Sequence, residues 1–106
     1  MTTVYIYPQQ MLPAPEQIVA MTGSLAIIGT LDYIPVKLIF DNQSTTSVVL
    51  SISLDGGETL IAWKTFSGGE TLILDDDIYS FPVGTIFYGT GDANGNFSIS
   101  YTYINL

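Results

Sequence analysis

The chain has 106 residues, of which 47% are hydrophobic and 11% charged, and ten acidic residues against two lysines give it a net charge of −8. This length allows one domain with one small core, and the hydrophobic fraction argues against a disordered chain. A nucleic-acid backbone or an anionic membrane surface requires several cationic contacts, so two lysines exclude both as partners. A basic protein partner remains open, because an acidic domain steers one towards itself.

The side chains that most enzymes and metal sites depend on are missing. There is no histidine, cysteine or arginine, so the commonest general base, the strongest nucleophile and any thiolate metal site are excluded. The N-terminus lacks the cationic start of a secretory signal, and no apolar stretch approaches the roughly 20 residues that span a bilayer. We therefore expect synthesis in a cytoplasm.

The first 16 residues read as an extended arm. Thr2–Tyr7 has the composition of a strand, in which Val4 and Ile6 alternate with Tyr5 and Tyr7 and both faces are apolar. Three prolines follow within eight residues and favour an extended chain, with Met11 and Leu12 as its apolar members. The alternative is that residues 2–7 form the first strand of the domain itself, followed by a loop.

Short strands follow over residues 17–21, 24–28 and 35–40, with a helical turn over 15–21 as the alternative at the first of these. The clearest strand covers residues 47–54, where Val48, Leu50, Ile52 and Leu54 share one face. This period of two predicts a half-buried strand with that face on the core. Asp55-Gly56-Gly57 then predicts a tight hairpin, with the return strand over 58–63.

The second half continues in the same way. A glycine turn over 66–69 precedes a strand over 71–74, and further strands are expected over 85–88 and 97–104. Asn94-Gly95 between the last two predicts a type I′ hairpin. About eight short strands at this spacing predict an all-β fold: a single small β-sandwich or jelly roll over residues 17–106, behind the arm.

Three groups of residues are candidate sites. Asp55 with Asp75–Asp77 would supply the carboxylate pair of a glycosidase, and Asp92, Asn94 and Asn96 have alternate spacing that resembles a calcium loop. All of these residues are explained equally by turn chemistry, so no catalytic, cofactor or metal site is predicted and Asp55 is interpreted as a corner. Trp63 and Phe66 could form an aromatic surface for a glycan, or could belong to the core.

From about Pro35 to Ile104 the chain has an ordered pattern of turns and strands, carried by the segments Asn42–Thr45, Ser53–Gly56, Gly68–Asp75, Pro82–Thr85 and Tyr101–Tyr103. In this pattern the second half resembles small β-sandwich virion proteins of tailed bacteriophages. The resemblance consists of turn and strand residues, which unrelated sandwiches can also share.

This resemblance implies a non-enzymatic capsid decoration (cement) protein that binds the major capsid protein on the outer shell of the virion, commonly as a trimer, and is made in the host cytoplasm. An arm of this kind can add a strand to the sheet of a neighbour. The pairing segment would be Val4, Tyr5, Ile6 and Tyr7, with Met11 and Leu12 as anchors. The alternatives are a carbohydrate-binding module and a small tail or adaptor protein.

Overall fold

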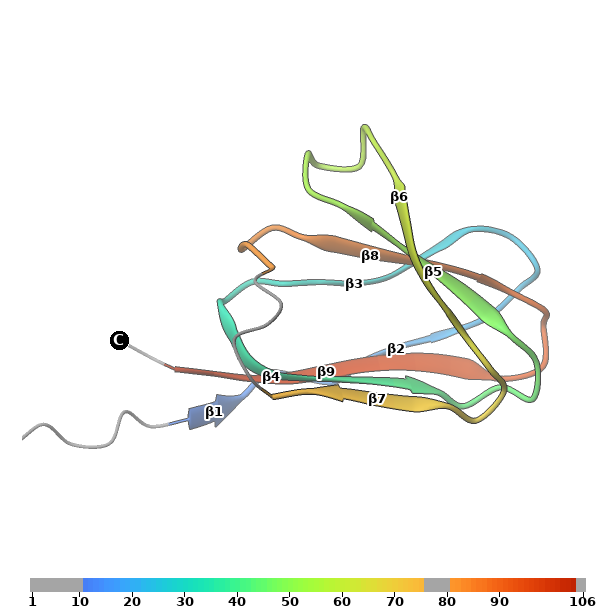
Figure 1. The fold of residues 1–106 in the computed structure, drawn as a ribbon, viewed down its shortest axis with the longest axis horizontal. Coiled ribbons are helices and arrows are strands. Elements are labelled where there is room, and N and C mark those ends of the chain that lie inside the picture. The colour runs from blue at the N-terminus through green and yellow to red at the C-terminus, as the bar shows by residue number, and fades with distance from the viewer. Residues whose placement is uncertain (1–10, 76–80, 105–106) are drawn as a thin grey trace, which may run out of the picture.

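A computed structural model describes residues 11–75 and 81–104 as two antiparallel sheets packed face to face, with no helix among those residues (Figure 1). In the first sheet, β1 (Met11–Pro13) and β2 (Gln17–Ala20) both pair with β9 (Asn96–Ile104), which is followed by β4 (Pro35–Asn42) and β7 (Thr71–Leu74). The second sheet has the order β3 (Ala26–Thr30), β8 (Ile86–Gly91), β5 (Val48–Ser53) and β6 (Ile61–Phe66). The expected all-β sandwich is confirmed.

The strand pairs are nested around one connection. β5 pairs with β6, β4 with β7, β3 with β8 and β2 with β9, all antiparallel. The chain is therefore one long hairpin rolled up into two sheets, which is the topology of a jelly roll. The connection over residues 54–60, which contains Asp55-Gly56-Gly57, is the apex of that hairpin and stands out from the second sheet (Figure 1).

Aromatic side chains from both sheets fill the space between them. Phe40 and Phe97 from the first sheet and Phe66 and Phe87 from the second are fully buried. The rings meet edge to face across the sandwich, with centroids 5.3 Å apart for Phe40 and Phe87 and 5.1 Å apart for Phe66 and Phe97. Burying each side chain stabilises the fold by about 2–3 kcal/mol, so these four rings hold the two sheets together.

The strand predicted over 47–54 forms, but its last residue does not face the core. Val48 and Leu50 are fully buried and Ile52 is half-buried against the core, whereas Leu54 is 54% exposed. The prediction for Leu54 is wrong because β5 ends at Ser53. Beyond that residue the chain turns away, and the period of two no longer determines where a side chain points.

Two turn predictions are also corrected. β6 begins only at Ile61, so residues 54–60 form a long connection in place of a tight hairpin. Asn94-Gly95 joins β8 to β9, which lie in different sheets. It is therefore no hairpin, and within the described residues no side-chain-bearing residue has the positive φ that a type I′ turn requires.

The N-terminal segment is partly absorbed into the sandwich. Met11 pairs with Ile104 and Leu12 with Tyr103, so Met11–Pro13 is an edge strand of the protein's own sheet and is no free arm. The role of Met11 and Leu12 as anchors on a partner stays a prediction. Residues 17–20 form β2 and not a helical turn, and the proposed pairing segment, Val4–Tyr7, lies outside the described residues.

Candidate functional site

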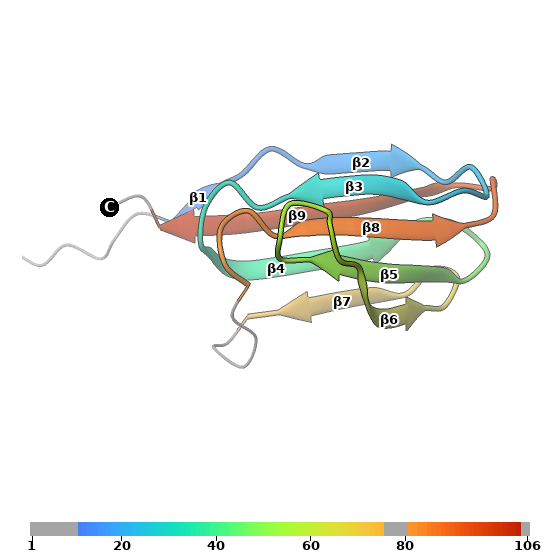
Figure 2. The same ribbon diagram turned by 90° about the horizontal axis from the view of Figure 1, so that it is seen from above.

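The connections at the two ends of the sandwich differ in character. One end, here called the polar end, carries residues 21–25, 43–47, 67–70 and 92–95. The opposite end, called the apolar end, carries residues 31–34, 54–60 and 81–85, and β1 begins there because Met11 pairs with the last residue of β9. Figure 2 shows the strands of both sheets running lengthwise between these ends.

Asn42 organises the polar end. Its side chain is completely buried. Its Nδ2 donates to the carbonyl oxygens of Thr46 (2.9 Å), Ser67 (2.9 Å) and Phe66 (3.3 Å), and its Oδ1 accepts from the N–H (3.1 Å) and hydroxyl (2.7 Å) of Ser44. One amide thus joins the 43–47 connection to the 67–70 turn, and all of its hydrogen-bonding capacity is used within the protein.

The residues that resembled a calcium loop lie at the same end, where the side chain of Asn94 also links two connections. Asn94 Oδ1 accepts from the N–H of Thr45 at 3.3 Å, and Asn94 Nδ2 donates to the hydroxyl of Thr46 at 3.2 Å. Residues 11–75 and 81–104 contain no cluster of three His, Cys, Asp or Glu residues that could hold a metal ion. Asn94 therefore acts as a tie between two connections.

Asp55 is a turn residue, as the sequence indicated. Its Oδ1 accepts from the hydroxyl of Ser53 and from the N–H of Thr59, both at 2.9 Å. The N–H of Thr59 first, and then the hydroxyls of Thr59 and Ser53, hold the pKa of Asp55 below its ordinary value. The exposed carboxylate fixes the shape of the 54–60 connection through these hydrogen bonds. Asp76 and Asp77, its possible partners in a catalytic pair, lie outside the described residues.

The apolar end exposes large hydrophobic side chains. Ile34 is 70% exposed and Val83 53% exposed, on two connections held side by side by a hydrogen bond from Gly84 N to Leu31 O of 2.8 Å (Figure 1). Of the eleven exposed large hydrophobic residues of the described chain, five belong to the connections of this end, Tyr33, Ile34, Leu54, Leu60 and Val83, and a sixth, Ile61, begins the adjoining strand β6. Where the 31–34 and 81–85 connections lie side by side, exposed apolar side chains such as Ile34 and Val83 mark an interaction surface.

The same connections also carry carboxylates. Asp32, Asp55 and Glu58 are all exposed and lie in the connections of the apolar end. Both lysines lie within strands, and Lys64 is held by Glu70 of the polar end through an ion pair of 2.9 Å. The connections of the apolar end thus combine exposed hydrophobic side chains with exposed carboxylates.

Trp63 and Phe66 do not form the expected aromatic surface. Phe66 is fully buried, and its ring lies 6.0 Å from that of Phe40. Trp63 is half-buried and packs edge to face on Phe81 with ring centroids 5.5 Å apart. Both belong to the aromatic core because β6 bulges at Trp63, where the pairing shifts between Leu50 and Ser51.

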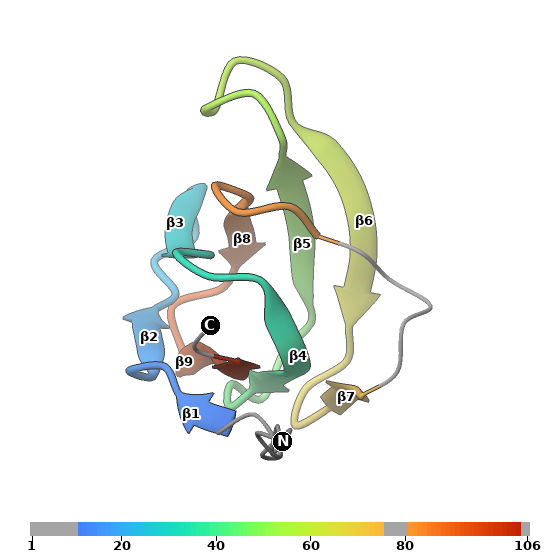
Figure 3. The ribbon, with the colours of Figure 1, turned by 90° about the vertical axis from the view of Figure 1, so that its left-hand side faces the viewer.

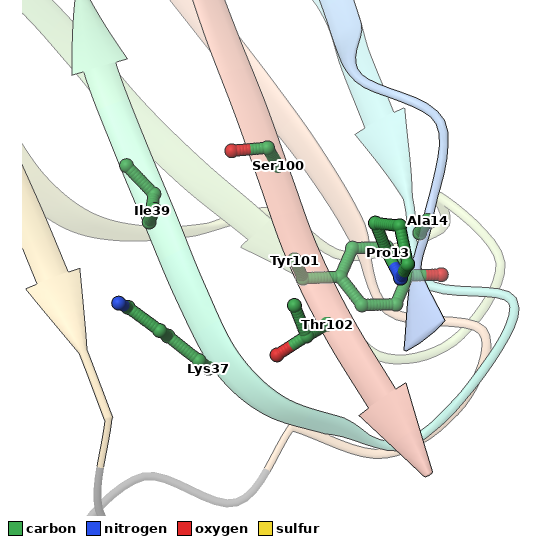
Figure 4. A pocket seen from close by; sticks show the side chains of 7 residues that line it. All are labelled: Pro13, Ala14, Lys37, Ile39, Ser100, Tyr101 and Thr102. Atoms are coloured by element: carbon green, nitrogen blue, oxygen red, sulfur yellow. The ribbon is translucent and has the colours of Figure 1, made fainter. Parts of the chain in front are cut away.

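A shallow hollow lies on the outer face of the first sheet, between β1 and β4 (Figure 4). It has a volume of about 160 Å³ and is lined by Pro13, Ala14, Lys37, Ile39, Ser100, Tyr101 and Thr102. Sites for drug-sized ligands occupy about 300–1,000 Å³. The buried hydroxyl of Thr102 has no hydrogen-bond partner, but the hollow is too small to enclose more than a small group.

The residues of the apolar end were missed by the sequence analysis. Their signal was present: Tyr33-Ile34 and Val83 stand directly beside Pro35, Pro82 and Gly84, in segments where polar residues are usual.

Within the described residues no helix has the length and hydropathy to cross a membrane. Comparison with known proteins finds no family model and no curated protein that matches this chain.

Proposed function

We propose that the protein is a non-enzymatic structural protein of a virion. More specifically, we propose a capsid decoration protein that binds the major capsid protein through its apolar end. The observation that carries this proposal is the set of exposed apolar side chains in the connections at one end of the sandwich, with Ile34 and Val83 on two connections that lie side by side. A protein surface with a complementary apolar recess would bury them, and basic residues around that recess would meet Asp32, Asp55 and Glu58.

The jelly roll is compatible with this role, because viral capsid domains use it, but lectin domains use it too. The structure gives the glycan alternative less support than the sequence did. Phe66 has no exposed face and Trp63 packs against the core, so the two aromatic residues that motivated a sugar platform do not provide one. Docking to a protein is therefore the proposal that we favour.

The test is sedimentation with capsid shells. The chain is mixed with shells assembled from the major capsid protein of the same genome, and its amount in the shell pellet is measured. We expect saturable binding that Ile34→Asp abolishes, because it places a charge within the apolar surface. Leu25→Asp is the matched control, since Leu25 is 51% exposed in a connection of the polar end. Wild-type protein that stays in the supernatant at saturating shell concentrations would refute the proposal.

A further inference from the structure

A sandwich of two open sheets has edges at which another strand can pair, and proteins commonly protect such edges. Among residues 11–75 and 81–104 the edges are β3 and β6 of the second sheet, and β7 and the β1–β2 side of the first. Figure 3 shows β2 beside β3 at one margin of the sandwich and β6 and β7 at the other.

Three of these edges are protected. Gln17 occupies the edge of β3: its Nε2 donates to Thr30 O at 3.0 Å and its Oε1 accepts from Thr30 N at 2.6 Å. β6 carries a bulge at Trp63 and a lysine beside it. The β1–β2 side is split into two short strands, with Pro13 and Pro15 at the break. Side-chain pairing, bulges, lysines and prolines each oppose the addition of a strand.

β7 has none of these features. Its pairing with β4 runs without a shift from Asp41–Thr71 to Leu38–Leu74, and it contains no proline or lysine. Asn42 N donates to Glu70 O at 2.9 Å, so Asn42 and Glu70 form a hydrogen-bonded pair. Hydrogen-bonded and non-bonded pairs alternate along an antiparallel ladder. The main-chain N–H and C=O groups of Thr71 and Ile73 therefore face the free side.

Both faces of β7 are also incompletely covered. Leu72 and Leu74 point inwards and are only half-buried, and Ile73 on the outer face is 50% exposed. A strand added here would meet apolar side chains on both of its faces. The matching strand must itself be apolar on both faces, which is the pattern of Val4–Tyr7.

We infer that the free edge of β7 binds the N-terminal strand, residues 2–7, of a second copy of this chain. The chain cannot place its own residues 2–7 at this edge. In the order β1-β9-β4-β7, a strand added beyond β7 would lie four inter-strand spacings from β1, or about 19 Å at about 4.8 Å per spacing. The four residue steps from Tyr7 to Met11 span at most about 14 Å. If each copy donates its strand to the next, the copies are linked head to tail. They form a ring when the rotation that relates successive copies closes on itself. The inference does not rest on the capsid proposal.

The chain has no cysteine, so disulfide trapping between introduced cysteines tests the pairing directly. One chain carries Ile73→Cys, and the other carries either Tyr5→Cys or Ile6→Cys; the two are refolded together and oxidised. Neighbouring residues of a strand point to opposite faces, so one of the two partners should cross-link to Cys at position 73 and the other should not. Ile18→Cys is the matched control, because Ile18 is 49% exposed on the edge strand β2.

Equal yields from both partners, or equal yields with the Ile18→Cys control, would show contact without strand pairing and would overturn the inference. Light scattering provides the second readout. Ile73→Pro removes the N–H that faces the free side of β7 but leaves the hydrogen bonds between β7 and β4 in place. This variant should therefore lose self-association, whereas Ile73→Ala should retain it. A wild-type chain that stays monomeric at every concentration refutes the strand exchange, and shell binding by that monomer would leave the capsid proposal intact.

Discussion

Asn42 is the residue on which the polar end depends most. Replacing it with alanine removes the acceptor of the buried Ser44 N–H and takes one of two donors from the carbonyl groups of Thr46 and Ser67, which keep the Ser44 hydroxyl and the Glu70 N–H. Unsatisfied buried groups cost about 1–3 kcal/mol each, and partial access of water reduces their sum. We expect Asn42→Ala to lower the free energy of unfolding by about 3 kcal/mol, measured by urea titration.

Asn94→Ala is the control for that experiment. Asn94 is also an asparagine that ties two connections, but it is exposed and its bonds are 3.2–3.4 Å long. Water replaces such bonds, so a loss below about 1 kcal/mol is expected. Equal losses for the two variants would show that burial of the Asn42 amide is not what makes it important.

The carboxylates of Asp55 and Glu70 predict how stability depends on pH. Hydrogen bonds from Thr59 and Ser53 hold the pKa of Asp55 below its ordinary value of 3.8, and the N–H of Ser67, with Lys64, holds the pKa of Glu70 below 4.5. A carboxylate whose pKa is lowered on folding stabilises the protein above its unfolded pKa, and this stabilisation is lost as the pH falls through the folded pKa.

We therefore expect acidification below about pH 4 to lower the melting temperature of the wild type more than that of Asp55→Asn. The asparagine keeps an acceptor oxygen but does not titrate. Thermal melts of both proteins between about pH 2 and about pH 6 measure the difference. Parallel curves for the two proteins would contradict the assignment of Asp55 as a group whose charge stabilises the turn.

At the scale of the elements, the close approach of two connections at the polar end predicts unequal effects at two adjacent glycines. A Cβ on Gly68 would overlap the backbone of Thr45, whereas a Cβ on Gly69 would meet nothing within 4 Å and would only strain a φ of +77°. Gly68→Ala should therefore cost about 2–3 kcal/mol and Gly69→Ala about 1 kcal/mol, measured by chemical unfolding. The reverse order would show that φ strain, and not the packing of the connections, is the larger effect.

Elements were predicted where the local pattern alone determines them. The strand at 71–74 was located exactly where it forms, and β5 was located to within a residue at each end, because alternation and turn residues are encoded locally. The apparent hairpin at Asn94-Gly95 was assigned wrongly for the complementary reason. A glycine turn looks the same whether it joins neighbours in one sheet or crosses between two sheets, and only the complete set of strand pairs decides which it is.

At the scale of the whole molecule, the nested pairing could not be read from the sequence, because β2 and β9 lie at opposite ends of the chain and no local signal names their partner. The same is true of the apolar end. Leu31 and Gly84 are brought together by the roll, so the surface that includes Ile34 and Val83 exists only once β3 and β8 have paired.

The boundary between arm and sandwich gives the last prediction. Removing residues 1–10 leaves every described strand intact. At a concentration low enough for the wild type to be monomeric the melting temperature should therefore be unchanged, while the self-association at higher concentrations is lost. Removing residues 1–14 also deletes β1, which pairs with the end of β9, and the buried Ala14, whose N–H donates to Tyr101 O at 2.8 Å. That deletion should destabilise the sandwich by about 2–3 kcal/mol. Differential scanning calorimetry and light scattering on both truncations separate the two effects, and an equal fall in melting temperature for both would show that residues 1–10 already belong to the fold of the single chain.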